Sequence, residues 1–430
     1  MNKKIGVIGL WHLGCVISVS WTKMGNQVFG FDYDIERVKK LQNGIPPLFE
    51  PNLEETIKEG LEKKSISLSN DINSLNDCDY IFLSYDTPVM DDDNCDTSIL
   101  KKSVTDVREI MKDGSVLIVS SQSPVGFCAV LRDILHEKNK NIDIAYSPEN
   151  LRLGEAIDCY LNPGRIILGT ASLLTEKMCV TLFNGITDQV LSMSLESAET
   201  VKHGINSFLS LSIVFANHLA DICEETNARI DDVVRGLKSD IRIGQRAYLA
   251  PGIGFSGGTL GRDLKVLEQI NNETNGFAKL FGSIHKYNSE RKLAIVQKIK
   301  KISGDLNGKR IGVLGLTYKP GTSTLRRSLP LEIVDLLVKE KANVIVFDPK
   351  ADYSELEAKP AFEISNGIEK ASEKADLLLI LTDWPEFKSY DWERNYINTN
   401  CKKIFDAKNC LEESEMKRIG YQYYSIGRGN

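Results

Sequence analysis

The sequence predicts an α/β protein with two open parallel-sheet domains joined by a long-helix central domain. Three observations predict this class. The chain opens with an apolar strand, a glycine turn and a helix-like segment, and a similar arrangement returns after residue 310. Between the two copies, the stretch from Ser194 to Thr226 contains no proline and carries apolar residues at helical spacing. Strands that alternate with helical segments are typical of parallel sheets covered by helices.

Composition narrows the class of protein. A chain of 430 residues is too long for one core and suggests two or three domains. A net charge of −6 without a basic stripe argues against nucleic-acid binding. No leader pattern and no run of about 18 apolar residues is present, so we expect no membrane span. The nine cysteines are scattered without a CxxC, which argues against a metal site and favours reduced thiols in the cytoplasm.

The first strand and turn predict a dinucleotide site. Residues 4–8 form an apolar strand that runs into Gly9-Leu10-Trp11-His12-Leu13-Gly14, and a second strand, 27–31, ends in Asp32. In such a Rossmann unit the turn and the helix N-terminus hold pyrophosphate, and the acid accepts the ribose hydroxyls. An acid at this position disfavours a 2′-phosphate. We therefore expect NAD rather than NADP, with Gly9, Gly14 and Asp32 as cofactor residues.

Trp11 departs from this fingerprint, because it occupies the position of the middle glycine of G-x-G-x-x-G. That glycine lets the backbone approach the pyrophosphate. An indole there either crowds the phosphates or stacks beside them.

Two further buried strands carry the cofactor prediction forward. Residues 79–85 and 115–120 are apolar runs typical of parallel strands, and they lead to Thr87 and Gln122. Ligands of such sheets lie at the carboxyl ends of the strands, so both side chains are expected near NAD. The acidic segment 91–93 could hold a metal, but a solvated turn is the interpretation that we favour.

The segment 251–263, Pro-Gly-Ile-Gly-Phe-Ser-Gly-Gly-Thr-Leu-Gly-Arg-Asp, is predicted to be an active-site loop. Its five glycines would let a ligand approach the backbone closely. The alternative is a flexible linker, which the interspersed apolar residues disfavour. Upstream, Lys202 and Asn206 lie four residues apart and would share one helix face.

The C-terminal half repeats the strand pattern of the first half. Residues 311–316 resemble 5–10, and 344–348 resemble 28–32. The glycine turn is replaced by Thr317-Tyr318-Lys319-Pro320-Gly321-Thr322, with Arg326 and Arg327 nearby. These hydroxyls and cations suit phosphate binding, and the alternative is a solvated charge cluster.

Together these motifs resemble the UDP-glucose/GDP-mannose dehydrogenase family over nearly the whole chain. The matching elements are the N-terminal fingerprint, Glu50-Pro51, Thr87-Pro88, Pro124-Val125-Gly126, Pro148-Glu149, Glu199-x-x-Lys202-x-x-x-Asn206, Arg242-Ile243-Gly244, the loop Gly254–Asp263 and Thr322-x-x-x-Arg326-x-Ser328.

The resemblance implies three domains: an NAD-binding Rossmann domain at 1–195, a central helical dimerisation domain at 196–300 and a C-terminal nucleotide-sugar domain at 301–430. It implies a cytoplasmic homodimer that oxidises a sugar CH2OH to a carboxylate in two hydride transfers. The cofactor residues implied are Gly9, Trp11, Gly14, Asp32, Arg37, Thr87, Gln122 and Arg326. The catalytic positions implied are Lys202, Asn206, Asp263 and Thr259, and the substrate positions are Glu149, Arg242, Tyr248, Gly257 and Lys319.

Three positions depart from the family pattern. Thr259 stands where the family has its cysteine nucleophile, Leu153 where it has the glutamate that activates water, and Gln122 where it has a threonine. The cysteine and glutamate serve the second oxidation, in which a thiolate traps the aldehyde and water cleaves the thioester. An unassisted hydroxyl is a far poorer nucleophile. We therefore expect a two-electron oxidation; the alternatives are four-electron oxidation by a route without cysteine, and a catalytically inactive binding protein.

Overall fold

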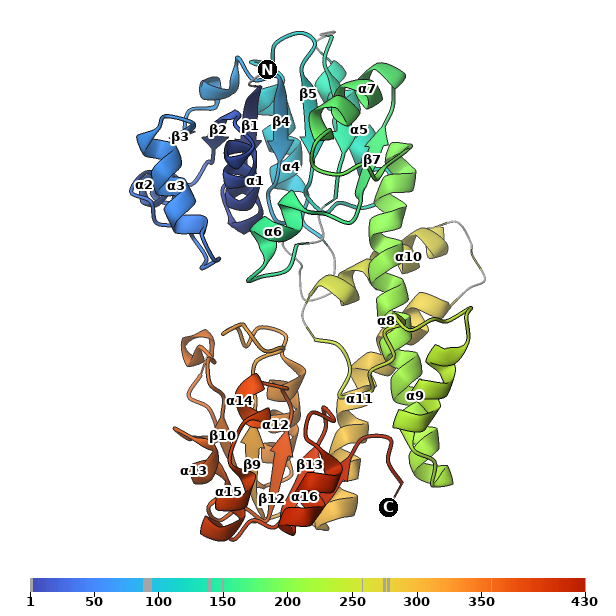
Figure 1. Ribbon diagram of the computed structural model, residues 1–430. Helices are drawn as coiled ribbons and strands as arrows, with labels where there is room; N and C mark the ends of the chain where they lie inside the picture. The colour runs from blue at the N-terminus through green and yellow to red at the C-terminus, as the bar shows by residue number, and fades with distance from the viewer. Residues whose placement is uncertain are drawn as a thin grey trace. The chain divides into compact units, whose positions relative to one another are not determined.

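The computed structural model describes residues 3–87, 95–137, 141–148, 151–256, 258–273, 276, 279–356 and 358–429. The chain divides into two compact units, residues 1–204 and 205–430 (Figure 1). Each unit is built around one sheet, which confirms the predicted α/β class with two Rossmann-like sheets and a long central helix.

The first unit contains a sheet of eight strands in the order β3-β2-β1-β4-β5-β6-β7-β8. Neighbouring strands are parallel except for β6 and β7, which pair antiparallel. Because β1 lies between β2 and β4, the chain reverses its direction of winding beside the end of β1, where such sheets bind ligands. The strands are β1 (Lys4–Ile8), β2 (Gln27–Phe31), β3 (Ile66–Ser69), β4 (Tyr80–Leu83), β5 (Val116–Val119), β6 (Asp143–Tyr146), β7 (Ile166–Thr170) and β8 (Val190–Met193).

Helices cover both faces of this sheet, which is why its strands are apolar throughout. Successive strand residues alternate between two cores: Val7 packs with α1, α3, α6 and α7, whereas Ile8 packs with α4, α5 and the start of α8. The helices are α1 (His12–Lys23), α2 (Ile35–Gln42), α3 (Leu53–Glu62), a 3-10 turn (Ile72–Leu75), α4 (Ser98–Val107), α5 (Phe127–His136), α6 (Ala156–Leu161), α7 (Leu173–Phe183) and α8 (Leu195–Thr226).

The second unit contains a six-stranded sheet in the order β11-β10-β9-β12-β13-β14, with all neighbours parallel. Its strand order repeats that of the first six strands of the other sheet, which confirms the predicted duplication. The strands are β9 (Arg310–Leu314), β10 (Asn343–Phe347), β11 (Glu363–Ile364), β12 (Leu377–Ile380), β13 (Lys403–Asp406) and β14 (Gln422–Ser425).

Central helices belong to the same unit and share its core. Ile295 and Ile299 of α11 pack with β9 and α12 residues, and with Ala220 of α8. A smaller cluster around Phe255 joins α8, α10 and α11. The helices are α9 (Ile230–Ser239), α10 (Thr259–Glu273), α11 (Leu280–Ser303), α12 (Leu329–Lys339), a 3-10 turn (Tyr353–Glu355), α13 (Ile368–Ser372), α14 (Pro385–Lys388), α15 (Trp392–Asn398) and α16 (Glu413–Ile419).

Helix α8 runs for 32 residues without a break, as the absence of proline predicts. Among the described helices it alone is long and apolar enough to cross a bilayer, judged by length and composition. One such helix is weak evidence for a span, because core helices of soluble proteins pass the same test.

Candidate functional site

The turn after β1 has the geometry of a pyrophosphate-binding turn. Gly9 has a φ of +92°, and a Cβ on Gly14 would lie 1.8 Å from the carbonyl oxygen of Gly9, so the first and third glycines are both required. No side chain caps α1 among the described residues. The first amides of a helix are unsatisfied and attract anions, so this helix start can hold a pyrophosphate.

Asp32 lies at the end of β2 and is 1% exposed. One carboxylate oxygen accepts hydrogen bonds from the Leu10 amide (2.7 Å) and from Nη1 of Arg37 (2.8 Å). The other oxygen accepts from the Asp34 amide (2.9 Å) and from the Tyr85 hydroxyl (3.2 Å). The structure therefore brings the predicted residues Asp32 and Arg37 into direct contact beside the turn.

The loops after β4 and β5 meet beside the same edge. Thr87 is buried, and its hydroxyl donates to the backbone carbonyl of Gln122 over 2.8 Å. Two residues predicted from separate strands are thus joined at the carboxyl ends of β4 and β5. The contact of Gln122 runs through its backbone, so this bond does not depend on the side chain that departs from the family pattern.

Two motif acids, Glu50 and Glu199, prove to be buried helix caps. The Glu50 carboxylate accepts from the amides of Gly154 (3.0 Å) and Ala156 (2.7 Å) at the start of α6, and it contacts Nε2 of His12 (3.0 Å). It therefore ties the first turn of α1 to the segment that carries Leu153.

Glu199, on α8, caps α5 in the same way. Its oxygens accept from the amides of Gly126 (2.6 Å) and Cys128 (2.8 Å), and burial raises the pKa of its carboxyl, against these hydrogen bonds. His203 adds a contact from Nε2 to the Ser123 carbonyl (2.8 Å). The sequence supplied the motif that contains Glu199 but no role for it. The only available signal was the position of Glu199, three residues before Lys202 in a matched motif. Nothing in the sequence indicated that it contacts the Pro124-Val125-Gly126 turn.

The polar residues expected around the sugar alcohol lie on α8 and α10. Lys202 is 8% exposed and lies one turn before Asn206 on α8. In the second unit, Nδ2 of Asn206 donates to Oδ2 of Asp263 over 2.5 Å, and Asp263 is fully buried. Arg262 lies near the other oxygen, with Nε 3.7 Å from Oδ1. A buried carboxylate with an amide and a guanidinium beside it can hold and polarise a hydroxyl.

The glycine-rich loop before α10 is held by hydrogen bonds rather than left as a linker. The Gly252 amide donates to Oδ1 of Asn217 (2.7 Å). Asn288 bonds both the amide and the carbonyl of Phe255 (2.8 and 2.9 Å), and a Cβ on Gly254 would lie 2.6 Å from Oδ1 of Asn288. The loop is therefore anchored on α8 and α11, and Gly254 is needed for its close approach to Asn288.

Thr259 begins α10 and is exposed, one turn before the buried Asp263. In the first unit, Leu153 is 43% exposed and directly precedes Gly154, whose φ is +90°. Glu149 and Gly257, two predicted substrate positions, lie outside the described residues.

The remaining predicted residues belong to the second unit. Arg242 and Tyr248 are exposed, and Arg242 forms an ion pair with Asp240 (2.7 Å). Lys319 lies in the turn after β9, with Nζ 5.6 Å from the Tyr318 ring centre. The exposed Arg326 follows this turn, in a loop whose amides are held by Glu355. Within the described residues, no hydrogen bond or ion pair joins Arg242 or Tyr248 to Lys319 or Arg326.

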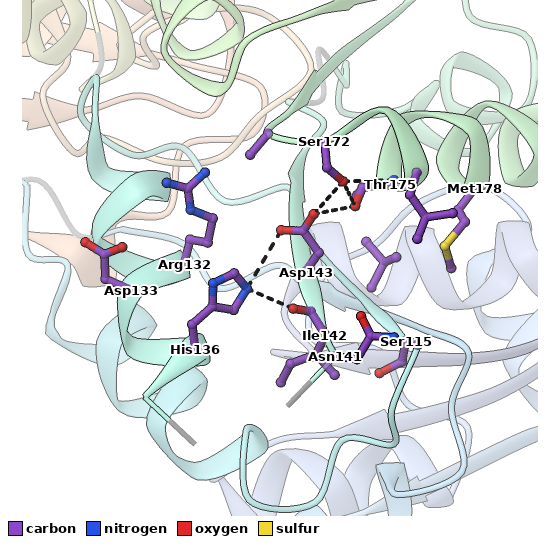
Figure 2. Close-up of a pocket in the computed structure, with 14 residues that line it drawn as sticks. Ser115, Arg132, Asp133, His136, Asn141, Ile142, Asp143, Ser172, Thr175 and Met178 are labelled. Carbon is purple, nitrogen blue, oxygen red and sulfur yellow. Dashed lines mark hydrogen bonds and ion pairs between the residues drawn. The ribbon is translucent and has the colours of Figure 1, made fainter. Parts of the chain in front are cut away.

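An open pocket of about 480 Å³ in the first unit is lined by none of these residues (Figure 2). It is at the amino ends of β5 and β6, where Asp143 accepts from Ser172 (2.9 Å) and from Thr175. His136 contacts the Ile142 carbonyl (2.8 Å) and lies 4.0 Å from Asp143. Parallel sheets bind ligands at the opposite edge, so this pocket is not the dehydrogenase site.

Three family models match consecutive parts of the chain. The NAD-binding domain of the UDP-glucose/GDP-mannose dehydrogenase family matches residues 3–187, its central domain 196–290 and its UDP-binding domain 312–413. The UDP-glucose 6-dehydrogenase of Rickettsia typhi is 32% identical over 98% of this chain and 99% of its own length. The chain belongs to the UDP-glucose/GDP-mannose dehydrogenase family. The UDP-glucose 6-dehydrogenase TuaD of Bacillus subtilis is also 32% identical, over 99% of this chain and 93% of its own.

Solved structures agree with this fold. A UDP-glucose dehydrogenase from Pyrobaculum islandicum superposes with a TM-score of 0.89 at 24% identity, over 100% of this chain and 98% of the other. A UDP-N-acetyl-mannosamine dehydrogenase, Cap5O from Staphylococcus aureus, is 26% identical with a TM-score of 0.82, over 99% of both chains.

The chain is thus an NAD-dependent nucleotide-sugar dehydrogenase of this family. Its residues fit the cofactor, because Gly9 and Gly14 allow the close packing of the turn and no side chain among the described residues caps the start of α1.

Proposed function

We propose that this dehydrogenase oxidises the sugar of a UDP-sugar once, from a primary alcohol to an aldehyde, and stops there. The match to a UDP-binding domain and the two relatives named UDP-glucose 6-dehydrogenase support this substrate class. The observation that carries the proposal is the contrast between two sets of positions. The polar residues of a first oxidation are present, whereas Thr259 and Leu153 occupy the positions of the second-stage thiol and glutamate.

NAD, when bound, accepts the hydride that leaves the alcohol carbon. Lys202 would stabilise the negative charge that develops on the sugar oxygen, assisted by the Asn206 amide. Asp263 would orient that amide and accept the proton that leaves the alcohol. Asp263 is fully buried and hydrogen-bonded to Asn206, so its carboxylate is fixed in orientation before substrate binds. One alcohol and one NAD then give one aldehyde, one NADH and one proton.

A second oxidation needs a group that adds to the aldehyde carbon. The Thr259 hydroxyl is a poor nucleophile without a dedicated base, and Leu153 can activate no water. Loss of nucleophilic and base assistance commonly costs several orders of magnitude in rate. The aldehyde is therefore expected to leave the enzyme.

The remaining assignments of site residues are also proposals. We assign Asp32, Arg37, Thr87 and Gln122 to the NAD site, together with the Gly9–Gly14 turn. We assign Arg326 to the NAD site as well. The positions assigned to the nucleotide sugar are Glu149, Arg242, Tyr248, Gly257 and Lys319.

Stoichiometry tests the central claim. The purified protein would be incubated with NAD and UDP-glucose or another UDP-sugar, and NADH would be counted against substrate consumed. We expect one NADH per substrate and an aldehyde that hydroxylamine traps for mass spectrometry. Two NADH per substrate and a carboxylate product would instead establish four-electron oxidation. If no UDP-sugar is turned over, the chain is a catalytically inactive binding protein.

Two matched variants separate the stages. Thr259→Ala should retain most of the first oxidation, because no covalent step uses this hydroxyl. Lys202→Ala should reduce it by about 100-fold or more, as loss of one preorganised charge partner does elsewhere. A large loss of activity in Thr259→Ala would contradict the proposal that this residue is dispensable.

We also propose a homodimer formed along α8 and a cytoplasmic location. Phe208, Phe215 and Ile222 are exposed at intervals of seven residues, which places them along one stripe of the helix. An exposed apolar stripe of this kind favours a partner helix. Light scattering at micromolar concentration should give twice the chain mass, and Phe208→Asp with Phe215→Asp should reduce it to a monomer.

A further inference from the structure

We propose that Trp11 is a positioning residue on the adenosine side of the NAD site: it receives Arg37 on its ring face when the cofactor ribose displaces that arginine from Asp32. This role rests on the proposed assignment of NAD to the turn after β1. It gives a role to the residue that departs most from the glycine fingerprint.

The backbone of Trp11 needs no glycine. Its φ of −80° and ψ of −162° are an ordinary extended conformation, and its carbonyl accepts the Cys15 amide over 2.9 Å. The turn between Gly9 and Gly14 therefore keeps its geometry with a side chain at this position. What distinguishes Trp11 is where the indole goes.

The indole lies against Arg37 on α2. Cζ of Arg37 is 5.1 Å from the centre of the Trp11 ring, within the range of a cation–π contact. The same guanidinium bonds Asp32 through Nη1 (2.8 Å) and Asp34 through Nη2 (3.3 Å). An aromatic face and two carboxylates thus hold this group, and its side chain is 24% exposed.

This arrangement covers the acid that should bind ribose. Asp32 is 1% exposed and both of its oxygens have donors, so a ribose hydroxyl can reach it only if a donor leaves. Two donors, the Leu10 and Asp34 amides, belong to the backbone, and a third is on the buried Tyr85. Arg37 is the partly exposed side-chain donor, and it is the one that can swing away.

Trp11 determines where Arg37 then goes. A guanidinium that leaves a carboxylate loses an ion pair but can keep its contact with an indole, because stacking does not require the same in-plane geometry. With Trp11 in place, the displaced Arg37, no longer held in the plane of the Asp32 carboxylate, stacks more closely on the indole beside the adenosine instead of moving into solvent. This contact is stronger with NAD bound than without it, so removal of the indole weakens NAD binding. The competing interpretation is that the indole crowds the pyrophosphate, and it predicts the opposite sign for removal of the indole.

The test measures NAD dissociation constants by isothermal titration calorimetry on the full chain. The variants are Trp11→Gly, Trp11→Phe, Arg37→Ala and the double variant Trp11→Gly/Arg37→Ala. A cation–π contact of this kind corresponds to a loss of about 3- to 30-fold in affinity for Trp11→Gly. Trp11→Phe, which keeps an aromatic face, should stay within about threefold of the unaltered chain.

The double variant separates positioning from a direct contact. If Trp11 acts through Arg37, Trp11→Gly should cost less than about twofold in the Arg37→Ala background. Equal losses in both backgrounds, an unchanged affinity, or tighter binding of NAD by Trp11→Gly would overturn the proposal. Circular dichroism and thermal unfolding verify that each variant folds, and Trp11→Phe carries the test if Trp11→Gly does not.

The outcomes also separate this inference from the cofactor assignment. If the unaltered chain fails to bind NAD, the assigned site is wrong, and the role of Trp11 falls with it. If the unaltered chain binds NAD and the Trp11 variants bind equally well, only the role of Trp11 is wrong.

Discussion

Asp32 and Asp348 occupy equivalent points in the two sheets, yet their surroundings differ in kind. Asp32 follows β2, and Asp348 follows β10. Each accepts the amide of a leucine in the turn after the neighbouring strand over 2.7 Å, from Leu10 in one unit and Leu316 in the other. The two units therefore share the strand, the turn, the acid and the hydrogen bond from the leucine amide to that acid.

The remaining hydrogen-bond partners distinguish Asp32, the proposed ribose-binding acid, from Asp348, whose role is structural. Asp348 also accepts from both the amide and the hydroxyl of Thr317 (3.0 Å each) and from Nε1 of Trp384 (3.1 Å). The amides of Lys350 and Ala351 complete its shell, both at 2.9 Å. Asp32 instead has Arg37, a partly exposed side chain, among its donors. A shell made of backbone and buried groups cannot open for a ligand, whereas one closed by a surface arginine can.

The helix starts differ in the same sense. Helix α1 begins at once after its turn and has no side-chain cap among the described residues. In the second unit the chain passes through Thr317–Thr322 before α12 begins, and Ser328 caps that helix. An uncapped helix start is available to a phosphate, and a capped one is not.

The largest expected effect is on stability, from Asp348→Ala. This change would leave several buried donors without an acceptor, each costing about 1–3 kcal/mol. We expect the free energy of unfolding of the second unit to fall by at least about 3 kcal/mol. Urea unfolding followed by tryptophan fluorescence measures it, and Asp348→Asn should recover part of the loss. A change below about 1 kcal/mol would show that the shell of Asp348 is not structural.

The matching change in the first unit, Asp32→Ala, should act mainly on binding. Hydrogen bonds to a charged group contribute about 1.5–3 kcal/mol, so we expect NAD affinity to fall by about 10- to 100-fold. Calorimetry with NAD and NADP measures this loss, and Asp348→Asn serves as the control variant. Equal affinity of the unaltered chain for both cofactors would contradict the role of Asp32 as the selectivity residue.

Ser328→Ala should cost about 1 kcal/mol of stability, the typical value of a helix cap. The cap is made by the hydroxyl, which accepts the Leu331 amide and donates to the Leu316 carbonyl. Thermal unfolding would report the loss, and Ser328→Thr should restore most of it. NAD affinity should not change in either variant, and a clear change would link this helix start to the cofactor site.

The smallest effect concerns pH, where two carboxyls should act in opposite directions. Burial opposes ionisation of Glu413, but hydrogen bonds from Arg229 and Lys417 outweigh it and lower its pKa from 4.5 to about 2. Its contribution to stability is therefore present above pH 4.5 and is lost as the pH falls from there to about 2. Burial raises the pKa of Glu199, so its contribution is present below pH 4.5 and declines as the pH rises through its folded value.

Glu413→Gln and Glu199→Gln isolate these two slopes. Unfolding curves measured from pH 3 to 7 should become flatter in the acid range for Glu413→Gln. For Glu199→Gln, the decline of stability with rising pH should diminish. Slopes identical to that of the unaltered chain would show that neither carboxyl differs in pKa between the folded and unfolded states.

The sequence by itself determined the two sheets, the turn after β1, the unbroken α8 and the family. Each of these follows from local patterns: apolar runs of strand length, glycines at fixed spacing, and helical periodicity without proline. It also placed Thr87 and Gln122 at one edge, because the carboxyl ends of parallel strands meet there, and the structure joins them by a hydrogen bond.

Only the tertiary structure decided how the acids are used. Glu50 caps a helix 106 residues further along the chain, and Glu199 caps one 71 residues before it, so neither role follows from neighbouring residues. The direction of the Trp11 indole and the covering of Asp32 by Arg37 likewise depend on how α2 packs beside the turn. Backbone preferences determine strands and turns locally. The hydrogen-bond partners of buried side chains depend on which segments the fold brings close enough for donor and acceptor atoms to lie about 3 Å apart.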